Sequence, residues 1–433
     1  MNINEKKIIE QSLSELFPIT RSITGSGNRK TLKFIQKKIP ISIKEIKSGT
    51  KIFDWKIPLE WKISDAYIKD TNKNKIIDFK KSNIHVVNYS IPVNGIYSWN
   101  ELKNHIFYNK KDPYSIPYRT TYYKKNWGFC VNRKQYNQIK NNKGPLKAII
   151  KSKLFKGSLS YGELKLPGLL KKEILISTYI CHPSLANDNL SGLIATLLIA
   201  KYIQSIKNRK YSYRIIFIPE TIGAIAYCHK NESKMKKIDT GLVICNVGGK
   251  GQFSYKQSFN KEHYINSIIE EVFKKKRLDY KIYPFDINGS DERQFSSLGF
   301  RINVASVFKD KYYDFKQYHT SKDDLSFVKT KNIIQSVNIY KSIIDKIDSI
   351  KFYKNLKPNC EIMLNKYNLH TNQGGSFKPK KGKITQLELI KWCLFLFGGK
   401  TSSYQIQKKL NITKKVLNKT ISILLKNKLI KDV

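Results

Sequence analysis

The chain has 433 residues, and its 80 Lys and Arg against 33 Asp and Glu give a formal net charge of +47. This length is sufficient for about two or three domains, each with its own hydrophobic core. The six cysteines lie far apart without a CxxC pair, which argues against a disulfide framework and a structural zinc knuckle. There is no apolar run of the roughly 18 residues that a membrane span needs, and the start does not resemble a secretory signal. The sequence therefore predicts a soluble cytoplasmic protein with no membrane partner.

The excess of lysine allows two interpretations. A basic surface is typical of proteins that bind nucleic acid or another polyanion. Alternatively, the composition reflects A/T-rich coding sequence, because lysine accompanies Ile, Asn and Tyr along the whole chain and is not gathered in one block. Under either interpretation we expect binding to polyanions at low salt.

The first 166 residues predict two helices followed by a β-rich region. The two helices lie between Ile3 and about Lys38, and Pro18 and Thr24–Gly27 separate them. From about Ser48 to Leu166, short β-type runs, aromatic residues and frequent turn residues predominate. These features predict a small β-rich domain over residues 48–166.

Strands and helices alternate from Glu173 to about Asp348. Such alternation is typical of a mainly parallel sheet with helices on both faces. The expected elements, in chain order, are strand Ile174–Ile180, helix Leu193–Ile206, strand Tyr213–Pro219, strand Leu242–Val247, helix His263–Lys275, strand Arg301–Val307 and helix Asn332–Tyr353.

The C-terminal part of the chain predicts a linker and a small helical domain. Residues 355–382 are rich in Gly and Pro, as is typical of a linker. Three short helices are expected at Gln386–Leu396, Ser403–Leu410 and Lys414–Asn427, with a tight turn at Phe397–Gly399. This pattern indicates a winged-helix or helix-turn-helix module over 383–433. The main α/β domain then comprises residues 1–47 and 167–354, and residues 48–166 interrupt it.

Four polar residues follow predicted strands in the α/β region. His182 and Asp188 lie in the loop after the predicted strand Ile174–Ile180. Glu220 ends the predicted strand Tyr213–Pro219, and His319 follows the predicted strand Arg301–Val307. Because ligands bind at the carboxyl edge of the strands in an open α/β sheet, we expect these side chains to converge there. Imidazole and carboxylate groups both suit zinc.

A hydrolytic zinc site needs about three protein ligands and an open position for water. His182, Asp188 and His319 can supply two nitrogens and one oxygen, and Glu220 is the candidate general base. Asp323 or Asp324 is a candidate for orienting a ligand histidine. The alternative is that each histidine is an ordinary polar residue, and spacing alone does not decide between them.

The same residues carry a resemblance to known families. Their order resembles that of the zinc-dependent aminopeptidases with a phosphorylase/hydrolase-like α/β fold. A wider set of motifs resembles a family of aminopeptidase-like proteins often labelled as polysaccharide-biosynthesis proteins. These motifs are Leu16–Pro18, Arg21–Gly25, Trp55–Trp61, Ile116–Tyr118, Tyr122-Tyr123, Trp127–Cys130, Cys181–Ser184, Ser290–Phe295 and Tyr318–Ser321. The resemblance implies a three-layer aminopeptidase-type domain, interrupted by a small β domain and followed by a winged helix.

The resemblance also implies zinc at His182, Asp188 and His319, with Glu220 as the general base. Two-metal aminopeptidases carry a second acidic ligand directly after the base, where this chain has Thr221, and an Asp on the next strand, where it has Cys245-Asn246. Because Thr is not a usual zinc ligand, we expect one zinc per chain. Coordination by a Cys245 thiolate is the alternative to simple burial of this residue.

Two further groups of residues are candidates for substrate binding. In Asp291-Glu292-Arg293, a carboxylate suits a free amino group and Arg suits a carboxylate or phosphate. The alternative is a solvated, capped start of a helix. The second group is aromatic, and it forms either the core of the β-rich domain or a platform for a sugar ring. Its members are Tyr118, Tyr122, Tyr123 and Trp127.

These observations predict a zinc hydrolase of the aminopeptidase type. We expect it to cleave an amide bond of a peptide or an N-acyl amino sugar, with a link to surface polysaccharide biosynthesis. A homo-oligomer remains open. The alternative is a peptidase-like regulator without turnover, which binds nucleic acid through its winged helix. Support for it comes from the net charge and from seven lysines near the C-terminus: Lys408, Lys409, Lys414, Lys415, Lys419, Lys426 and Lys428.

Overall fold

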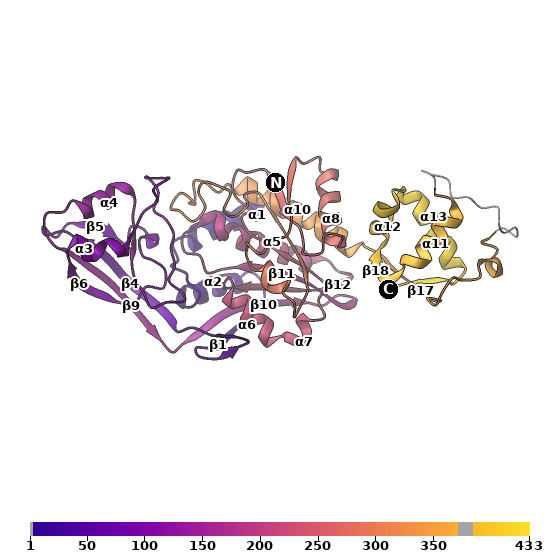
Figure 1. The fold of residues 1–433 in the computed structure, drawn as a ribbon, viewed down its shortest axis with the longest axis horizontal. Helices are drawn as coiled ribbons and strands as arrows, with labels where there is room; N and C mark the ends of the chain where they lie inside the picture. The colour runs from indigo at the N-terminus through magenta and orange to yellow at the C-terminus, as the bar shows by residue number, and fades with distance from the viewer. Residues whose placement is uncertain (1–2, 371–383) are drawn as a thin grey trace. The chain divides into compact units, whose positions relative to one another are not determined.

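The computed structural model describes residues 3–370 and 384–433 (Figure 1). The chain forms two compact units. The first comprises Met1–Lys261 and Lys275–Ser342, and the second comprises Glu262–Lys274 and Ile343–Val433. The predicted boundary at residue 354 therefore differs from the observed one, because one helix and the end of another belong to the second unit. None of the described helices is both long and apolar enough to cross a membrane.

The two predicted N-terminal helices are present as α1 (Ile3–Leu16) and α2 (Ser26–Gln36). Gly25 precedes α2 with a φ of 119°, and a Cβ atom there would lie 2.6 Å from the backbone oxygen of Trp61. Only glycine tolerates both this dihedral angle and this close approach. The glycine therefore fixes where α2 begins.

An eight-stranded mixed sheet forms the centre of the first unit, in the order β1-β10-β12-β11-β13-β16-β14-β15. The inner pairs β12–β11, β11–β13 and β13–β16 are parallel, as is the edge pair β14–β15. The pairs β1–β10, β10–β12 and β14–β16 are antiparallel. The strands are β1 (Ser42–Lys47), β10 (Ser158–Leu166), β11 (Leu170–Tyr179), β12 (Tyr211–Ile218), β13 (Thr240–Val243), β14 (Phe253–Lys256), β15 (Tyr280–Tyr283) and β16 (Asn303–Phe308).

This arrangement corrects two expectations. The sheet is mixed rather than mainly parallel: antiparallel pairs flank its parallel centre on both sides, and the outermost pair β14–β15 is again parallel. In addition, β10 belongs to the central sheet, although we placed residues 158–166 in the small β-rich domain. A strand pattern reveals the strand but not its partner, and β10 follows the preceding strand after a short turn.

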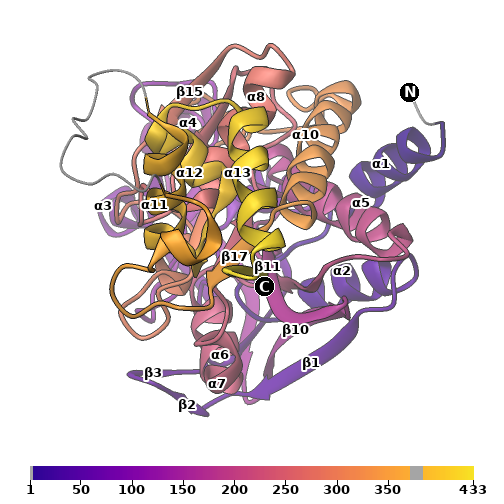
Figure 2. The same ribbon diagram turned by 90° about the vertical axis from the view of Figure 1, so that its right-hand side faces the viewer.

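Helices cover both faces of the central sheet. Figure 2 shows α5 (Gly192–Ser205) and α10 (Thr330–Asp348) on one side, and α6 (Ile222–Lys230) with α7 (Glu232–Met235) on the other. The first nine residues of α5 are all buried, as expected for a helix that is apolar on all sides. α10 is fixed to the sheet by Tyr340, whose hydroxyl donates to the carbonyl oxygen of Val307 at 2.7 Å.

A second sheet, with four antiparallel strands in the order β5-β4-β9-β6, lies in the same unit (Figure 1). It has its own apolar cluster, which includes Ile68, Leu102, Phe129 and Ile150. Its strands are β4 (Glu60–Lys69), β5 (Lys75–Asp78), β6 (Val93–Tyr97) and β9 (Leu146–Phe155). Short elements complete this region: β2 (Lys51–Ile52), β3 (Trp55–Lys56), α3 (Trp99–Leu102), β7 (Ile106–Phe107), β8 (Phe129–Cys130) and α4 (Arg133–Lys140).

The described residues of the second unit form a three-stranded antiparallel sheet, in the order β18-β17-β19, and the helices α8, α11, α12 and α13. Capping side chains set the start of two helices: Thr385 accepts from the N–H of Glu388, and Ser402 from that of Gln405. The elements are α8 (Tyr264–Lys275), β17 (Phe352–Asn355), α11 (Gln386–Leu396), β18 (Gly398–Ser402), α12 (Ser403–Leu410), α13 (Lys414–Lys426) and β19 (Ile430–Asp432). All three C-terminal helices match their predicted bounds within one residue.

The predicted linker over 355–382 is only partly described, because residues 371–382 lie outside the described residues. The preceding part is not a plain linker. Leu364 is buried in the apolar cluster of the second unit, together with Leu389, Leu417 and Leu424. Residues around a 3-10 turn at Leu364–Tyr367 therefore belong to this core.

Candidate metal and catalytic site

The loop after β11 carries the first two candidate ligands at the carboxyl edge of the sheet. His182 and Asp188 are both buried, and the peptide bond after Asp188 is cis. Asp323 fixes the loop, since its carboxylate accepts the backbone N–H groups of Asn187 at 2.6 Å and of Asp188 at 2.8 Å. The hydroxyl of Tyr179, at the end of β11, donates to Asp188 Oδ1 at 2.5 Å. The position of Asp188 is thus set by both its backbone and its side chain.

The structure brings His182, Asp188 and His319 together, as predicted. One potential ligand atom from each lies within 4.8 Å of the other two, and His319 Nε2 lies 3.1 Å from Asp188 Oδ2. The His319 loop is tied to a segment of the region between β7 and β8. The backbone N–H of Tyr118 donates to the carbonyl oxygen of His319 at 2.7 Å, and Ser321 N–H donates to that of Ile116 at 2.8 Å.

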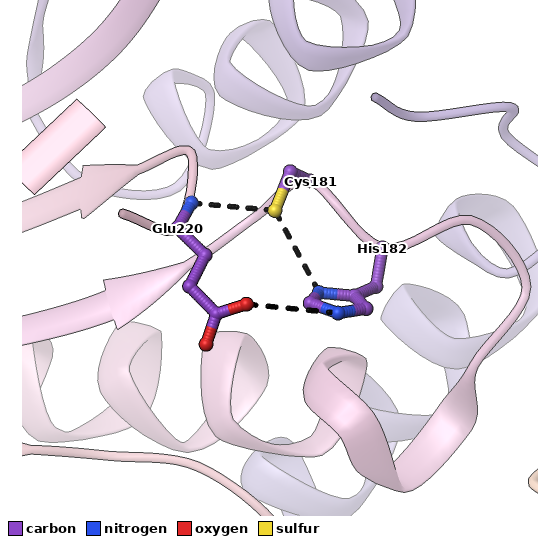
Figure 3. Close-up of side chains that lie close together, drawn as sticks. All are labelled: Cys181, His182 and Glu220. Atoms are coloured by element: carbon purple, nitrogen blue, oxygen red, sulfur yellow. Dashed lines mark hydrogen bonds and ion pairs between the residues drawn. The ribbon is translucent and has the colours of Figure 1, made fainter. Parts of the chain in front are cut away.

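Glu220 follows β12 and faces His182 (Figure 3). Its Oε2 atom lies 3.8 Å from His182 Nε2, and its Oε1 atom accepts a hydrogen bond of 2.7 Å from Ser290 Oγ. The backbone N–H of Glu220 donates to Cys181 Sγ at 3.3 Å, and this sulfur lies 3.6 Å from His182 Nδ1. His182 therefore has Glu220 beside one ring nitrogen and Cys181 beside the other.

Electrostatics give His182 and Asp188 the protonation states that a metal ion needs. Burial lowers the pKa of His182 to about 4, so its imidazole is neutral at pH 7. Burial alone would raise the pKa of Asp188, but His182, His319 and Tyr179 outweigh it and lower this pKa to about 2. Neutral imidazole and ionised carboxylate are the forms that bind divalent cations. Two nitrogens and one oxygen, from two buried residues and the partly exposed His319, fit a zinc ion.

The surroundings of Glu220, unlike those of Asp188, disfavour the ionised carboxylate. Burial raises its pKa well above the ordinary range, and the carboxylates of Asp291 and Asp188 raise it further. Burial likewise raises the pKa of Asp291 to about 7, even though this carboxylate accepts the N–H of Thr221 at 2.7 Å. Strongly shifted carboxyl groups in a cavity are typical of functional sites.

Comparisons with known proteins identify the family of the chain. Residues 10–349 match a family described as a domain of unknown function, DUF4910. A Clostridium acetobutylicum protein, named as a polysaccharide biosynthesis protein with an aminopeptidase-like domain, is 41% identical over 394 residues, which cover 91% of this chain and 89% of the relative. The chain belongs to the DUF4910 family. The resemblance to aminopeptidase-like proteins noted in its sequence is therefore confirmed.

Solved structures support the same fold. The crystal structure of a C. acetobutylicum protein named as a peptidase has a TM-score of 0.80 and 38% identity, and the match covers 99% of this chain and 98% of that one. A zinc aminopeptidase from Bacillus subtilis has a TM-score of 0.57 and 13% identity, with 79% and 94% of the two chains covered. The DUF4910 protein thus has a mixed α/β fold of the aminopeptidase type.

The three predicted substrate-binding residues of the DUF4910 protein differ in their surroundings. Asp291 and Glu292 are buried rather than solvated. Glu292 bonds to Lys256 Nζ at 3.0 Å and to the hydroxyl of Tyr312 at 2.7 Å, so its carboxylate is already occupied. Arg293 is exposed. Of the three, Arg293 lines the cavity described next.

A cavity of about 140 Å³ adjoins the candidate ligands. Its wall combines the catalytic candidates with several tyrosines and with the loop before α9 (Glu292–Phe295). The lining residues are Tyr179, Asp188, Glu220, Thr221, Gly289, Ser290, Arg293, Tyr312, Tyr313, Tyr318 and His319. This volume is similar to that of cavities that hold a single benzene-sized group.

The aromatic candidates split between the two interpretations. Trp127 packs against the apolar cluster of the four-stranded sheet, as the core interpretation predicts. Tyr118 instead contacts both candidate histidines, with ring centroids 5.4 Å from His182 and 5.1 Å from His319. Its hydroxyl lies 3.0 Å from that of Tyr122, whereas Tyr123 is exposed.

Sequence reasoning missed three residues of the site: Tyr179, Cys181 and Ser290. All three lie within motifs or beside strand ends that we singled out, but their contacts depend on the tertiary fold. The proposed role of Asp323 in orienting a histidine is replaced by its bonds to the backbone of the Asp188 loop. Asp324 accepts the N–H of Ser326 at 2.8 Å, a bond within its own turn. Cys245 is buried, and in the described chain no candidate group of metal ligands includes it.

Proposed function

We propose that this DUF4910 protein is a zinc-dependent hydrolase of the aminopeptidase type that cleaves an amide bond. The observation that carries this proposal is the convergence of His182, Asp188 and His319 within 4.8 Å, with Glu220 beside His182. The aminopeptidase-type fold supports it, although a fold by itself does not establish an activity.

One zinc ion per chain is proposed, held by His182, Asp188 and His319. Zinc bound there would act as a Lewis acid and would lower the pKa of a coordinated water to about 7. The position after the general base supports a single ion, because Thr221 offers a hydroxyl where a second metal would need a carboxylate. The N–H of Thr221 instead fixes the buried carboxylate of Asp291.

Glu220 is proposed as the general base and, later, the general acid. The hydroxyl of Ser290 holds its Oε1 atom, which leaves Oε2 on the side of His182. From this position Glu220 would accept a proton from water and deliver it to the leaving amine.

The substrate is proposed to be a peptide or an N-acyl amino sugar. The name of the C. acetobutylicum relative links that protein to polysaccharide biosynthesis, and the small cavity suits a short acyl group. The four-stranded sheet is proposed to act as an inserted domain that shapes the entrance. The bonds from Ile116 and Tyr118 to the His319 loop support this role.

Hydrolysis of small amides tests the proposal directly. Wild-type protein should hydrolyse at least one member of a panel of aminoacyl anilides and N-acetyl amino sugars. Chelation should abolish the activity, and zinc should restore it. His182→Ala should lose activity, whereas His229→Ala, at the far end of α6, should retain it. Absence of metal-dependent hydrolysis over a broad panel would contradict the proposal.

A second candidate function rests on the C-terminal unit. Along the chain its elements follow the order α11, β18, α12, α13 and β19, and in the sheet β17 lies between β18 and β19. This arrangement supports assignment as a winged-helix-like module. Lys414, Lys415, Lys419 and Lys426 of α13 are exposed. A sequence-specific complex with DNA at physiological salt would favour this regulator function, whereas binding that is lost as salt rises indicates only the general excess of charge.

A further inference from the structure

Arg293, on α9, places a positively charged guanidinium at the wall of the cavity. Arg293 is exposed and lines the cavity together with Glu220 and His319. Its guanidinium donates a long hydrogen bond of 3.5 Å to the carbonyl oxygen of Ile287, and it forms no ion pair within residues 3–370 and 384–433. The two preceding acidic residues, in contrast, are buried: Glu292 bonds to Lys256 and Tyr312, and Asp291 accepts the N–H of Thr221 through Oδ1.

Both carboxylates that line the cavity already have proposed roles. In the described part of the chain they are Asp188, a candidate metal ligand, and Glu220, the candidate general base. Asp188 is bonded to Tyr179 and paired with His319, and Glu220 accepts from Ser290. An enzyme that recognises a free amino terminus needs an acceptor for it, and a planar guanidinium instead matches carboxylate and phosphate groups.

Two exposed tyrosines accompany Arg293. Tyr313 lines the cavity and is 59% exposed. Tyr123, which is 67% exposed, lies within electrostatic reach of both Glu220 and Arg293: burial and Glu220 raise the pKa of its phenol, and Arg293 lowers it. Tyr123 also packs edge-on against Trp55, with ring centroids 5.5 Å apart. The net charge of +47 would further favour the approach of anions.

We propose that Arg293 recognises an anionic group of the substrate, and that the substrate is an N-acyl compound with a carboxylate or phosphate close to its amide. A peptide recognised by its free amino terminus is the excluded class. This inference rests on the proposed hydrolase function and adds the class of substrate to it.

Binding to the zinc-loaded full-length protein tests the inference without turnover. Glu220→Gln serves as the background, and calorimetry at about 150 mM salt screens long-range attraction. The first matched pair of probes is N-acetyl-L-alanine and N-acetyl-L-alaninamide. The second is N-acetylglucosamine 1-phosphate and N-acetylglucosamine, and L-alaninamide supplies a free amine. The pair that shows the larger preference identifies the anion as carboxylate or phosphate.

We expect the anionic member of at least one pair to bind about tenfold more tightly than its neutral partner, as a charge-assisted bond would give. Arg293→Ala should abolish this preference, and Arg293→Lys should restore part of it. Arg133→Ala removes an exposed arginine from α4 and should leave the preference intact. Equal binding of both members, tightest binding of L-alaninamide, or the same loss in Arg133→Ala would overturn the inference.

The outcomes separate this inference from the proposed function. If Arg293-dependent binding is found but wild-type protein hydrolyses no amide, the hydrolase proposal fails and the anion site stands. If wild-type protein hydrolyses free-amine substrates and shows no anion preference, the hydrolase proposal stands and the anion site is wrong.

Discussion

Two clusters of charged residues that differ in kind lie on strand β12 and just beyond its end. Arg214, within the strand, is surrounded by opposite charges: its guanidinium bonds to Glu163 at 2.8 Å and to Glu173 at 2.5 and 2.8 Å. Glu220, just beyond the end of the strand, is surrounded by like charges from Asp188, Asp291 and Glu292. The first cluster is balanced within the protein, and the second is not.

The difference supports the proposed division into a structural cluster and a functional one. Burial would raise the pKa of Glu163, but the ammonium groups of Lys44 and Lys165 and the hydroxyl of Tyr227 lower it to about 2. Like charges in the second raise the pKa of Glu220. A fold does not retain like charges in its interior for stability, so the second cluster is best explained by a cation that binds there and a proton that Glu220 transfers.

The largest expected effect comes from the unbalanced cluster. Glu220→Gln keeps the shape of the side chain but removes the proton acceptor, and general acid–base groups contribute about 10²–10⁴-fold in rate. Turnover should therefore fall at least a hundredfold, with little change in zinc content or melting temperature, as measured by steady-state kinetics, elemental analysis and calorimetry. Loss of zinc in this variant would make Glu220 a ligand instead.

Substitutions in the Arg214 cluster should lower the free energy of unfolding rather than the activity. Arg214→Met leaves Glu163 and Glu173 without their shared partner, and breaking a buried ion pair costs about 3–5 kcal/mol. Denaturant unfolding should show this loss of free energy of unfolding. The zinc content of the folded fraction should equal that of wild type. A variant as stable as wild type would show that the pair contributes nothing net.

The pH dependence of stability gives a smaller effect with a defined sign. Because the pKa of Glu163 is lower in the folded protein, its contribution is present above its unfolded pKa of about 4.3 and is lost as the pH falls toward 2. The difference in free energy of unfolding between wild type and Glu163→Gln should reach about 3 kcal/mol at neutral pH and shrink below about pH 4. A difference that is constant with pH would contradict this assignment.

The smallest expected effect comes from an exposed pair. Lys6 and Glu10 lie one turn apart on α1, 3.9 Å from each other, and both side chains are more than half exposed. Water screens such pairs, so Lys6→Gln should change the free energy of unfolding by less than about 0.5 kcal/mol. A loss as large as that of Arg214→Met would remove the distinction between buried and exposed pairs.

Long periodic elements were predictable from sequence, and short or mixed ones were not. The apolar pattern of α5 and of the three C-terminal helices gave their bounds within one residue. β14 and β15 were missed because each has four residues and includes lysine. The sheet partner of β10 was also missed, since pairing depends on the tertiary fold.

The candidate site shows the same limit. His182, Asp188, Glu220 and His319 were chosen because each follows a predicted strand, and topology brings such positions together. The contacts of Cys181 and Ser290 with Glu220 join residues 39 and 70 positions apart in the chain. No local pattern indicates such contacts. The burial of Glu292 was equally hidden, because its partner Lys256 is a buried lysine on β14.

The most direct test of the central claim is the position of a metal ion in crystals of the zinc-loaded protein. Anomalous scattering measured on both sides of the zinc absorption edge should show one peak per chain, within about 2.0–2.2 Å of His182, Asp188 and His319. Cys181, His182 and Glu220 also lie within 4.8 Å of one another and form the competing site (Figure 3). A peak among these three residues, or the absence of any peak, would contradict the account.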